Sequence, residues 1–376
     1  MSLGGRRCRG SASAPLSPGS HHGLNSKPAT TGKPIGPRPF AAALVATALI
    51  SLPAAAQDGP WNHRVLLATS GDGLNWTVQP QILAEKASVP ELFLSPEGRP
   101  TILFVDASGA REGIGAMQQT ADGSWRRVET NLREVDPNVV RLADGSYRAY
   151  VKAGLDGAMA AYASGDGLNW QPLGEVFRDA RYRNATDPDV FETPEEWVML
   201  VSLGPRMLRC TSKDGLSFTT DGTVLELGGS VSDTVKIPGG WRTFFHVNAD
   251  PRTGARMRIR SAFTADGKTW QVEDGDRVVA PPTGPASLGV ADPAPVQLPD
   301  GSWLMAIKSF IAPASPGPVQ PVQPGGIETH QVMSATSPDG LTWTRDEGIR
   351  VARASVPCAI NDGDQRVLLY FVQPPD

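Results

Sequence analysis

Cysteine and histidine are scarce in this sequence, and their scarcity argues against several kinds of site. Of its three cysteines, Cys210 and Cys358 lie in different repeat units, so a disulfide between them is not favoured. The histidines beyond the N-terminal leader are His63, His246 and His330, and they lack zinc-ligand spacing. There is also no Gly-x-Ser-x-Gly segment, no P-loop and no dinucleotide-binding fingerprint. These absences leave zinc, nucleotide-dependent and α/β-hydrolase chemistry without support.

Long apolar segments are lacking too, apart from one short run near the N-terminus. The run from Phe40 to Leu52 follows a basic stretch and precedes small residues ending at Ala56, which is typical of a secretory signal peptide. It is too short for a stable transmembrane helix, and no later stretch is long enough. We therefore expect residues 1–56 to be a disordered leader plus signal peptide, residues 57–376 to form the folded domain, and the protein to be secreted or periplasmic.

The charge of the chain also limits its partners. The leader carries six basic residues and no acidic one, so removing it changes the formal net charge from −4 to −10. An acidic chain is an unlikely partner for nucleic acid. The sequence contains 40 glycines and 34 prolines, as a β-rich fold with many turns requires.

A short Asp-Pro motif recurs before apolar, alternating segments. Each copy is followed by an apolar run, a turn and a second apolar run, which predicts a β-hairpin. A series of such hairpins indicates a radial repeat. The copies begin at Asp136, Asp187 and Asp292, with a looser copy at Asp233 and two copies that keep only the proline, at Val89 and Val356.

A second motif, Ser-Gly-Asp-Gly-Leu-Asn-Trp, alternates with the first. We expect its aspartate to cap a turn by accepting backbone N–H bonds, its glycine to supply a positive φ, and its tryptophan to cover the hairpin end. Recurrence in every repeat favours this structural role over a catalytic one. The copies span 70–76, 164–170, 212–218, 264–270 and 337–343, with a shortened copy at 120–125.

The order of the two motifs predicts how the chain closes. The opening hairpin, about His63 to Ala84, lacks an inner partner, and the closing hairpin, about Val356 to Val372, lacks an outer one. Joined, they would build a sixth blade from both termini and remove exposed sheet edges. We predict an all-β, six-bladed β-propeller of four-stranded antiparallel blades.

Both motifs resemble those of known families. The Asp-containing turns resemble the Asp boxes (BNR-type repeats) of sialidase-like propellers, although the family pattern has one more residue between Asp and Gly. The Asp-Pro strand starts are similar to those of glycoside hydrolase family 43 and its relatives. The resemblance covers most of the chain after the leader and implies a propeller with carbohydrate-related activity. No Arg-Ile-Pro segment of the sialidase kind is present, which argues against sialidase activity.

The predicted topology gathers the Asp-Pro starts around the channel mouth on one face. Carboxylates placed there suit a general acid and base pair, but each aspartate could instead cap its own strand start. We assign Asp136 and Asp187 as base and supporting carboxylate, and Glu91 or Asp292 as acid. The aligned ring reads Val89, Asp136, Asp187, Asp233, Asp292 and Val356, the next polar column Glu91, Asn138 and Asp189, and the second-strand ends Asp106, Lys152, Ser202, Asn248 and Lys308.

Further side chains on that face are candidates for binding substrate. Lys152 and Lys308 would compensate the aspartates, and Asn248 would line the mouth. An insertion from Phe177 to Asn184 carries Arg181, Tyr182 and Arg183, which would hold an anionic or sugar ligand or pair with acidic neighbours. Two more insertions, Asp276 to Leu288 and Ile311 to Thr329, share this rim.

These residues predict a secreted carbohydrate-active enzyme, a glycoside hydrolase with a carbohydrate or small-molecule ligand. A non-catalytic glycan- or protein-binding propeller and a Ca²⁺-dependent lactonase or phosphoesterase remain alternatives. For the last, Glu91, Asn138 and Asp189 offer oxygen ligands for Ca²⁺; otherwise we expect no metal and no cofactor. We also expect a monomer.

Overall fold

The computed structural model describes residues 59–109, 112–225, 229–250, 252–281, 289–311, 330–362 and 366–375. The predicted leader lies outside these residues, and so do residues 282–288 and 312–329 of two predicted insertions. No helix within the described residues is long and apolar enough to cross a membrane.

The described chain folds into six antiparallel sheets after a single 3₁₀ turn, η1 (Pro60–Asn62). Blade one contains β4 (Ala87–Leu94), β5 (Pro100–Asp106), β6 (Gly113–Gln119) and β7 (Trp125–Val128). Blade two contains β8 (Val135–Arg141), β9 (Tyr147–Ala153), β10 (Ala158–Ser164) and β11 (Gln171–Phe177). Blade three contains β12 (Thr186–Glu192), β13 (Trp197–Leu203), β14 (Arg206–Ser212) and β15 (Val224–Leu225).

In the next two blades the outer strand is split into two short pieces. Blade four contains β16 (Gly229–Ile237), β17 (Gly240–Val247), β18 (Arg258–Thr264), and the pieces β19 (Gln271–Val272) and β20 (Val278–Val279). Blade five contains β21 (Gly289–Gln297), β22 (Trp303–Phe310), β23 (His330–Ser337), and the pieces β24 (Thr344–Arg345) and β25 (Val351–Ala352).

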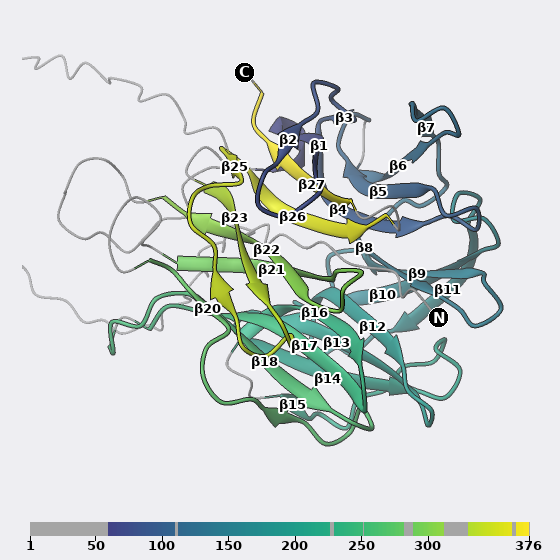
Figure 1. Cartoon of the computed structure of the whole chain (residues 1–376). Helices are drawn as coiled ribbons and strands as arrows, with labels where there is room; N and C mark the ends of the chain where they lie inside the picture. Colours follow the sequence, from purple (N-terminus) through teal and green to yellow (C-terminus); the bar gives the residue numbers. More distant parts are fainter. Residues whose placement is uncertain are drawn as a thin grey trace, which may run out of the picture. The chain divides into compact units, whose positions relative to one another are not determined.

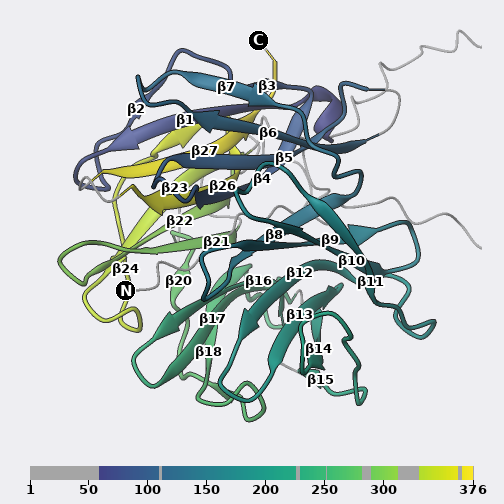
Figure 2. The same cartoon turned by 90° about the vertical axis from the view of Figure 1, so that its right-hand side faces the viewer.

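Blade six combines strands from both ends of the described chain. It contains β26 (Ser355–Asn361), β27 (Val367–Gln373), β1 (Arg64–Ser70), β2 (Thr77–Val78) and β3 (Ala84–Glu85). The strands β1 and β27 pair antiparallel along their whole length, from Arg64 opposite Gln373 to Ser70 opposite Val367. In Figures 1 and 2 the purple β1 accordingly lies beside the yellow β27.

The six innermost strands form a closed ring. Contacts run from β4 to β8, β12, β16, β21 and β26, and from β26 back to β4. Between neighbouring blades the buried apolar side chains form one cluster per seam, so both faces of each sheet are covered. The adjacent residues Phe244 and Phe245, for example, point into the seams on opposite sides of blade four. The predicted all-β six-bladed propeller is confirmed.

The turns of the second motif have the predicted chemistry. Asp72 Oδ1 accepts the backbone N–H groups of Leu74 and Asn75 at 2.9 and 2.7 Å, Gly73 has φ of 72°, and Trp76 Nε1 donates to Gly73 O at 2.9 Å. Equivalent bonds centre on Asp166, Asp214, Asp266 and Asp339. These turns lie at the ends of the strands opposite to the Asp-Pro starts, as predicted. Cys210 is a free, buried thiol, so no disulfide joins it to Cys358.

Candidate active site at the inner-strand bulges

Each inner strand begins with a β-bulge that holds one residue in the left-handed region. Two residues of the inner strand lose their partner at each bulge, and the first of them has φ between 48 and 53°. Valine occupies this position in three blades although a β-branched residue is costly there, so the fold imposes the conformation. The six residues are Val89, Asp136, Asp187, Val231, Asp292 and Val356.

This register corrects the predicted ring in blade four. Val231, not Asp233, occupies the bulge, and Asp233 is paired with Phe244 two positions later. Asp233 therefore belongs to the next column, together with Glu91, Asn138 and Asp189. The prediction was wrong because Ser232 replaces the proline that marks the other five bulges.

The residues facing the bulges on the second strands also differ from the prediction. The true positions are Val105, Lys152, Ser202, His246, Lys308 and Val372, each opposite the residue that precedes its bulge. Asp106 lies one residue further and forms an ion pair with Arg127. Asn248 is exposed, beyond the end of β17. Neither Asp106 nor Asn248 belongs to the ring.

Blades two and three bring together the two aspartates assigned to catalysis. Asp136 and Lys152 are both half-buried, on neighbouring strands of blade two. Asp187 is only 7% exposed, and its Oδ2 accepts a hydrogen bond from Thr186 Oγ1 at 2.6 Å. Since β8 and β12 are in contact, adjacent blades offer two carboxylates at the same position in different environments.

Blade five uses its aspartate differently. Asp292 and Lys308 are 1% and 3% exposed, and Lys308 Nζ lies 2.5 Å from Asp292 Oδ2. His246 Nδ1 lies 3.8 Å from Asp292 Oδ1. Burial lowers the pKa of His246 to about 4 despite the nearby carboxylate, so the imidazole is neutral at pH 7. Asp292 is thus enclosed by Lys308 and His246 and does not reach solvent, which weighs against it as the acid.

The next column of polar side chains joins blades one to four. Glu91, which is fully buried, accepts the Val139 N–H at 2.7 Å and the Asn138 amide at 3.3 Å. Asn138 Oδ1 in turn accepts the Val190 N–H at 2.9 Å. Asp189 Oδ2 accepts the Thr234 hydroxyl at 2.8 Å. These bonds form a belt between successive blades, and they weigh against Glu91 as an acid.

The same bonds bear on the Ca²⁺ hypothesis. Glu91, Asn138 and Asp189 each have a side-chain oxygen bound to the following blade. Among the described residues, no group of three or more His, Cys, Asp or Glu side chains is arranged to hold a metal ion. One side-chain oxygen of each of these three residues is therefore used in a hydrogen bond between blades.

The predicted Arg-Tyr-Arg segment leads directly into the bulge of blade three. Arg181 is exposed, pairs with Asp179 at 2.6 Å and lies over the Tyr182 ring at 5.2 Å. Tyr182 is half-buried against the core between blades two and three. Arg183 is exposed. The segment therefore borders Asp187, and Asp179 compensates the charge of Arg181.

Comparison with known proteins gives no family for this chain. No family model and no curated protein matches the sequence. Similar solved structures include an endo-arabinase from Bacteroides thetaiotaomicron, with 16% identity, 65% of this chain and 95% of that chain covered, and a TM-score of 0.46. Others are a thermostable family-43 glycoside hydrolase (14%, 70% and 94%, TM-score 0.48) and an α-L-arabinofuranosidase from Clostridium thermocellum (14%, 71% and 94%, TM-score 0.46). Similarity this low does not say what this chain binds or cleaves.

Proposed function

We propose that this protein is a secreted carbohydrate-active enzyme, a glycoside hydrolase that acts where the inner strands begin. The observation that carries the proposal is the contrast among the bulge aspartates. Asp136 is half-buried, whereas Asp187 and Asp292 are 7% and 1% exposed. Of these three aspartates, only Asp136 is accessible to solvent, and it has a buried carboxylate, Asp187, on the adjacent blade. The resemblance of the Asp-Pro starts to family 43 supplies the substrate class.

In this proposal the two aspartates have separate roles. Asp136 acts as the general base, because a base must reach the proton that it removes. The departing sugar oxygen takes its proton from Glu91 or Asp292 in this proposal, and the burial of both is the ground for the second candidate below. Asp187, whose carboxylate is fixed by the hydrogen bond from Thr186, is the supporting carboxylate and adds negative charge next to the base. Lys152 and the exposed Arg183 would contact sugar hydroxyl groups in this proposal.

A specific observation also favours a second candidate, a non-catalytic glycan-binding propeller. Three of the predicted carboxylates, Glu91, Asp189 and Asp292, are buried and bound to protein groups. Most acidic side chains on this face therefore bind other protein groups. Such a face resembles a ligand-binding surface more than a catalytic site with an acid and a base. Turnover separates the two candidates.

The test compares Asp136→Asn and Asp187→Asn with Asp166→Asn, which makes the same change on the opposite face of blade two. The substrates are aryl glycosides and neutral polysaccharides. We expect wild-type turnover on at least one substrate, a loss of about 100-fold or more in kcat for Asp136→Asn, and unchanged kcat for Asp166→Asn. A folded wild-type protein that binds a glycan of the panel and cleaves none would favour the second candidate. Unchanged turnover in Asp136→Asn would remove its catalytic role.

A further inference from the structure

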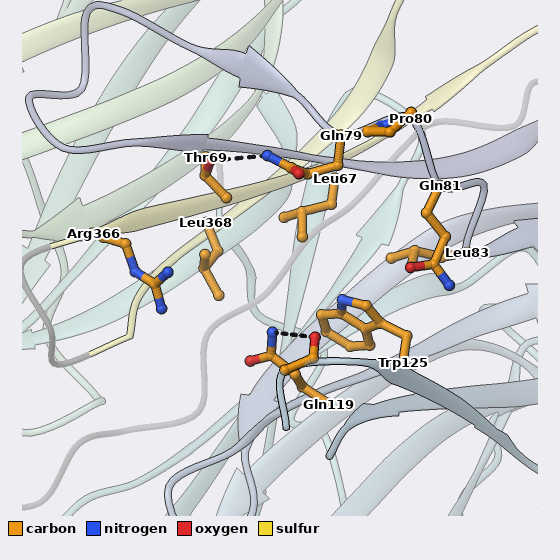
Figure 3. Close-up of a pocket in the computed structure, with 11 residues that line it drawn as sticks. Leu67, Thr69, Gln79, Pro80, Gln81, Leu83, Gln119, Trp125, Arg366 and Leu368 are labelled. Atoms are coloured by element: carbon orange, nitrogen blue, oxygen red, sulfur yellow. Dashed lines mark hydrogen bonds between the residues drawn. The ribbon is translucent and has the colours of Figure 1, made fainter. Parts of the chain in front are cut away.

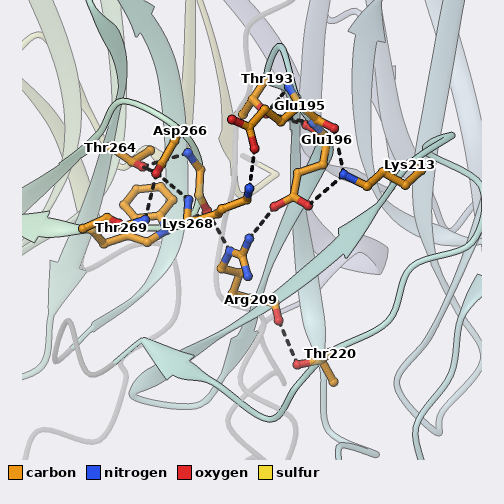
Figure 4. Close-up of polar contacts among 12 residues, drawn as sticks. Thr193, Glu195, Glu196, Arg209, Lys213, Thr220, Thr264, Asp266, Lys268 and Thr269 are labelled. Atoms are coloured by element: carbon orange, nitrogen blue, oxygen red, sulfur yellow. Dashed lines mark hydrogen bonds and ion pairs between the residues drawn. The ribbon is translucent and has the colours of Figure 1, made fainter.

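Side chains of one blade bind the turn of the next blade at five of the six seams. Arg209 of blade three, for example, donates from Nε to Gly267 O of blade four at 2.7 Å and pairs with Glu196 at 2.6 Å. Figure 4 shows Arg209 between Glu196 and the turn that contains Asp266 and Lys268. The other seams have the bonds Asn131 to Trp170 O, Arg148 to Asp214 O, Arg277 to Leu341 O and Arg350 to Leu74 O.

The sixth seam, from blade six to blade one, is built differently. The turn of blade one is the shortened copy at 120–125, and no described side chain of blade six donates to it. A cleft with a volume of about 320 Å³ opens there between the two blades. Its apolar floor is Leu67, Leu83 and Leu368, and Trp125 forms one wall (Figure 3). The cleft is at the lower end of the range of small-molecule sites, about 300–1,000 Å³.

Trp125 differs from the other turn tryptophans because it is half-buried and has no hydrogen bond at Nε1 within the described part of the chain, whereas Trp170, which also lacks that bond, is fully buried. In the full-length turns, Trp76, Trp270 and Trp343 each donate Nε1–H to a glycine carbonyl at 2.9 to 3.2 Å. Trp125 stands only two residues after its glycine, and its Nε1 has no hydrogen bond to any described residue. The half-buried ring is held edge-on by Tyr370, with ring centroids 5.8 Å apart. The cleft is therefore bordered by a fixed indole with an available donor.

The polar groups around the cleft are mostly neutral amides. Gln79 and Gln119 each use their amide N–H, on Thr69 Oγ1 and Gly123 O at 3.2 Å, and keep their carbonyl oxygens as acceptors. Gln81 is exposed at the rim. The one cationic lining residue, Arg366, pairs with Asp362 at 2.7 Å. An uncharged ligand with an apolar face and hydroxyl edges fits this combination.

We propose that this cleft binds a unit of a neutral saccharide. The sugar ring would lie against the face of Trp125 through its C–H groups, with its hydroxyl groups on the glutamine amides. The indole N–H, which points along the ring plane, would be left for a hydroxyl group of the adjoining unit. The site lies at the ends of β1 and β6, opposite to the ends where the bulges lie, so it is separate from Asp136. It is a binding site without chemistry, and it does not depend on whether the bulge aspartates catalyse.

Affinity electrophoresis of the folded chain tests this site. Native gels would contain arabinan, xylan, mannan or, as an anionic probe, polygalacturonate, and the protein would carry Asp136→Asn so that the gel polysaccharide is not consumed. We expect retardation by at least one neutral polysaccharide, a dissociation constant roughly tenfold or more weaker in Trp125→Ala, and an intermediate value in Trp125→Phe. Trp61→Ala, which removes an exposed indole outside the cleft, should bind as well as its parent.

Several results would overturn the proposal. They are the absence of retardation in every neutral gel, equal binding by Trp125→Ala, and retardation by polygalacturonate alone. If Trp125→Ala unfolds, Gln81→Ala replaces it in the test, because Gln81 is exposed and its loss should not disturb the fold. Unchanged binding by the Gln81→Ala variant would then count against the site. Failure of every glycosidase assay would leave this result untouched, since it measures retention and not turnover.

Discussion

Blades two and five carry the same charges at equivalent positions but use them differently. Asp136 and Lys152 are half-buried in blade two, whereas Asp292 and Lys308 are almost fully buried in blade five. The equivalent position of the preceding blade holds Val105 before blade two and His246 before blade five. A repeated motif therefore determines where a carboxylate lies, and its burial and neighbours determine whether it is available for chemistry.

The largest effect is expected when the ring in which both blades lie is opened. Deleting residues 351–376 removes β26 and β27. The strand β1 then lacks its inner partner β27, and β4 and β21 lack β26, the inner strand that lies between them in the ring. We expect loss of the cooperative unfolding transition, because exposed blade edges replace a closed sheet ring. A soluble truncated protein with an unchanged Tm, measured by circular dichroism, would contradict closure by the two ends.

The second largest effect separates the two lysines. Lys308→Ala should lower the free energy of unfolding by about 3–5 kcal/mol, because it leaves Asp292 buried without its cation. Lys152→Ala, at the equivalent half-buried position, should lower it by less than about 1 kcal/mol. Urea denaturation of both variants measures the difference.

The double variant Asp292→Asn with Lys308→Met provides the control. It removes both charges and keeps most of the side-chain volume, so it should recover much of the stability lost in Lys308→Ala. Equal losses in the Lys308→Ala and Lys152→Ala variants would show that the two blades do not differ in this way.

The third effect is a pH dependence that arises where His246 of blade four faces Asp292 of blade five. His246 has a folded-state pKa of about 4, below the ordinary histidine value of 6.5, because burial disfavours the charged ring. The unfolded chain therefore binds the proton first as pH falls from about 6.5 to 4. Stability from this source is fully present above pH 6.5 and declines by up to roughly 3 kcal/mol by pH 4.

Replacing the titrating ring tests this assignment. His246→Gln should flatten the pH dependence of the free energy of unfolding between pH 4 and 6.5, measured by urea denaturation across that range. His63→Gln, a second buried histidine at the other side of the ring, provides the comparison. An unchanged slope in His246→Gln would mean that its ring is not the group that titrates.

The smallest effect distinguishes the turn aspartate of blade two, Asp166, from its half-buried bulge aspartate, Asp136. Asp166 accepts the backbone N–H groups of Leu168 and Asn169 at 2.8 Å. Asp166→Asn should cost about 0.5–2 kcal/mol, as other lost caps do, whereas Asp136→Asn should cost less than about 0.5 kcal/mol. Equal losses in the two variants, seen in thermal unfolding, would show that Asp136 is also a cap.

The sequence was sufficient to predict the blades and turns because both depend on local chemistry. Alternating apolar runs, an aspartate that can accept two N–H groups and a glycine with positive φ recur at fixed spacing, as in 70–76 and 164–170. The six-bladed ring followed from counting these units. The equivalent positions of Asp136 and Asp187 at the strand starts of adjacent blades were also predicted correctly, although the bulges themselves were not.

The rest of the site depends on contacts between blades, which no local pattern reveals. Glu91 and Asp292 look like available acids in the sequence, but they are bound by Val139 of the next blade and by Lys308. The position of Asp233 was wrong because a bulge without proline leaves no mark on the sequence. The different position of Trp125 had one mark in the sequence, because its turn is shorter than the five other turns.

The belt and the turn bonds also set an order in which the ring can be completed during synthesis. Glu91 must wait for Val139, Asn138 for Val190 and Asp189 for Thr234, so each blade leaves the ribosome before the groups that satisfy it. Among the five turn bonds named above, Arg350 is the one that reaches back to an earlier part of the chain, the carbonyl of Leu74. Each blade therefore gains its blade-to-blade hydrogen bonds only after the following blade has been synthesised.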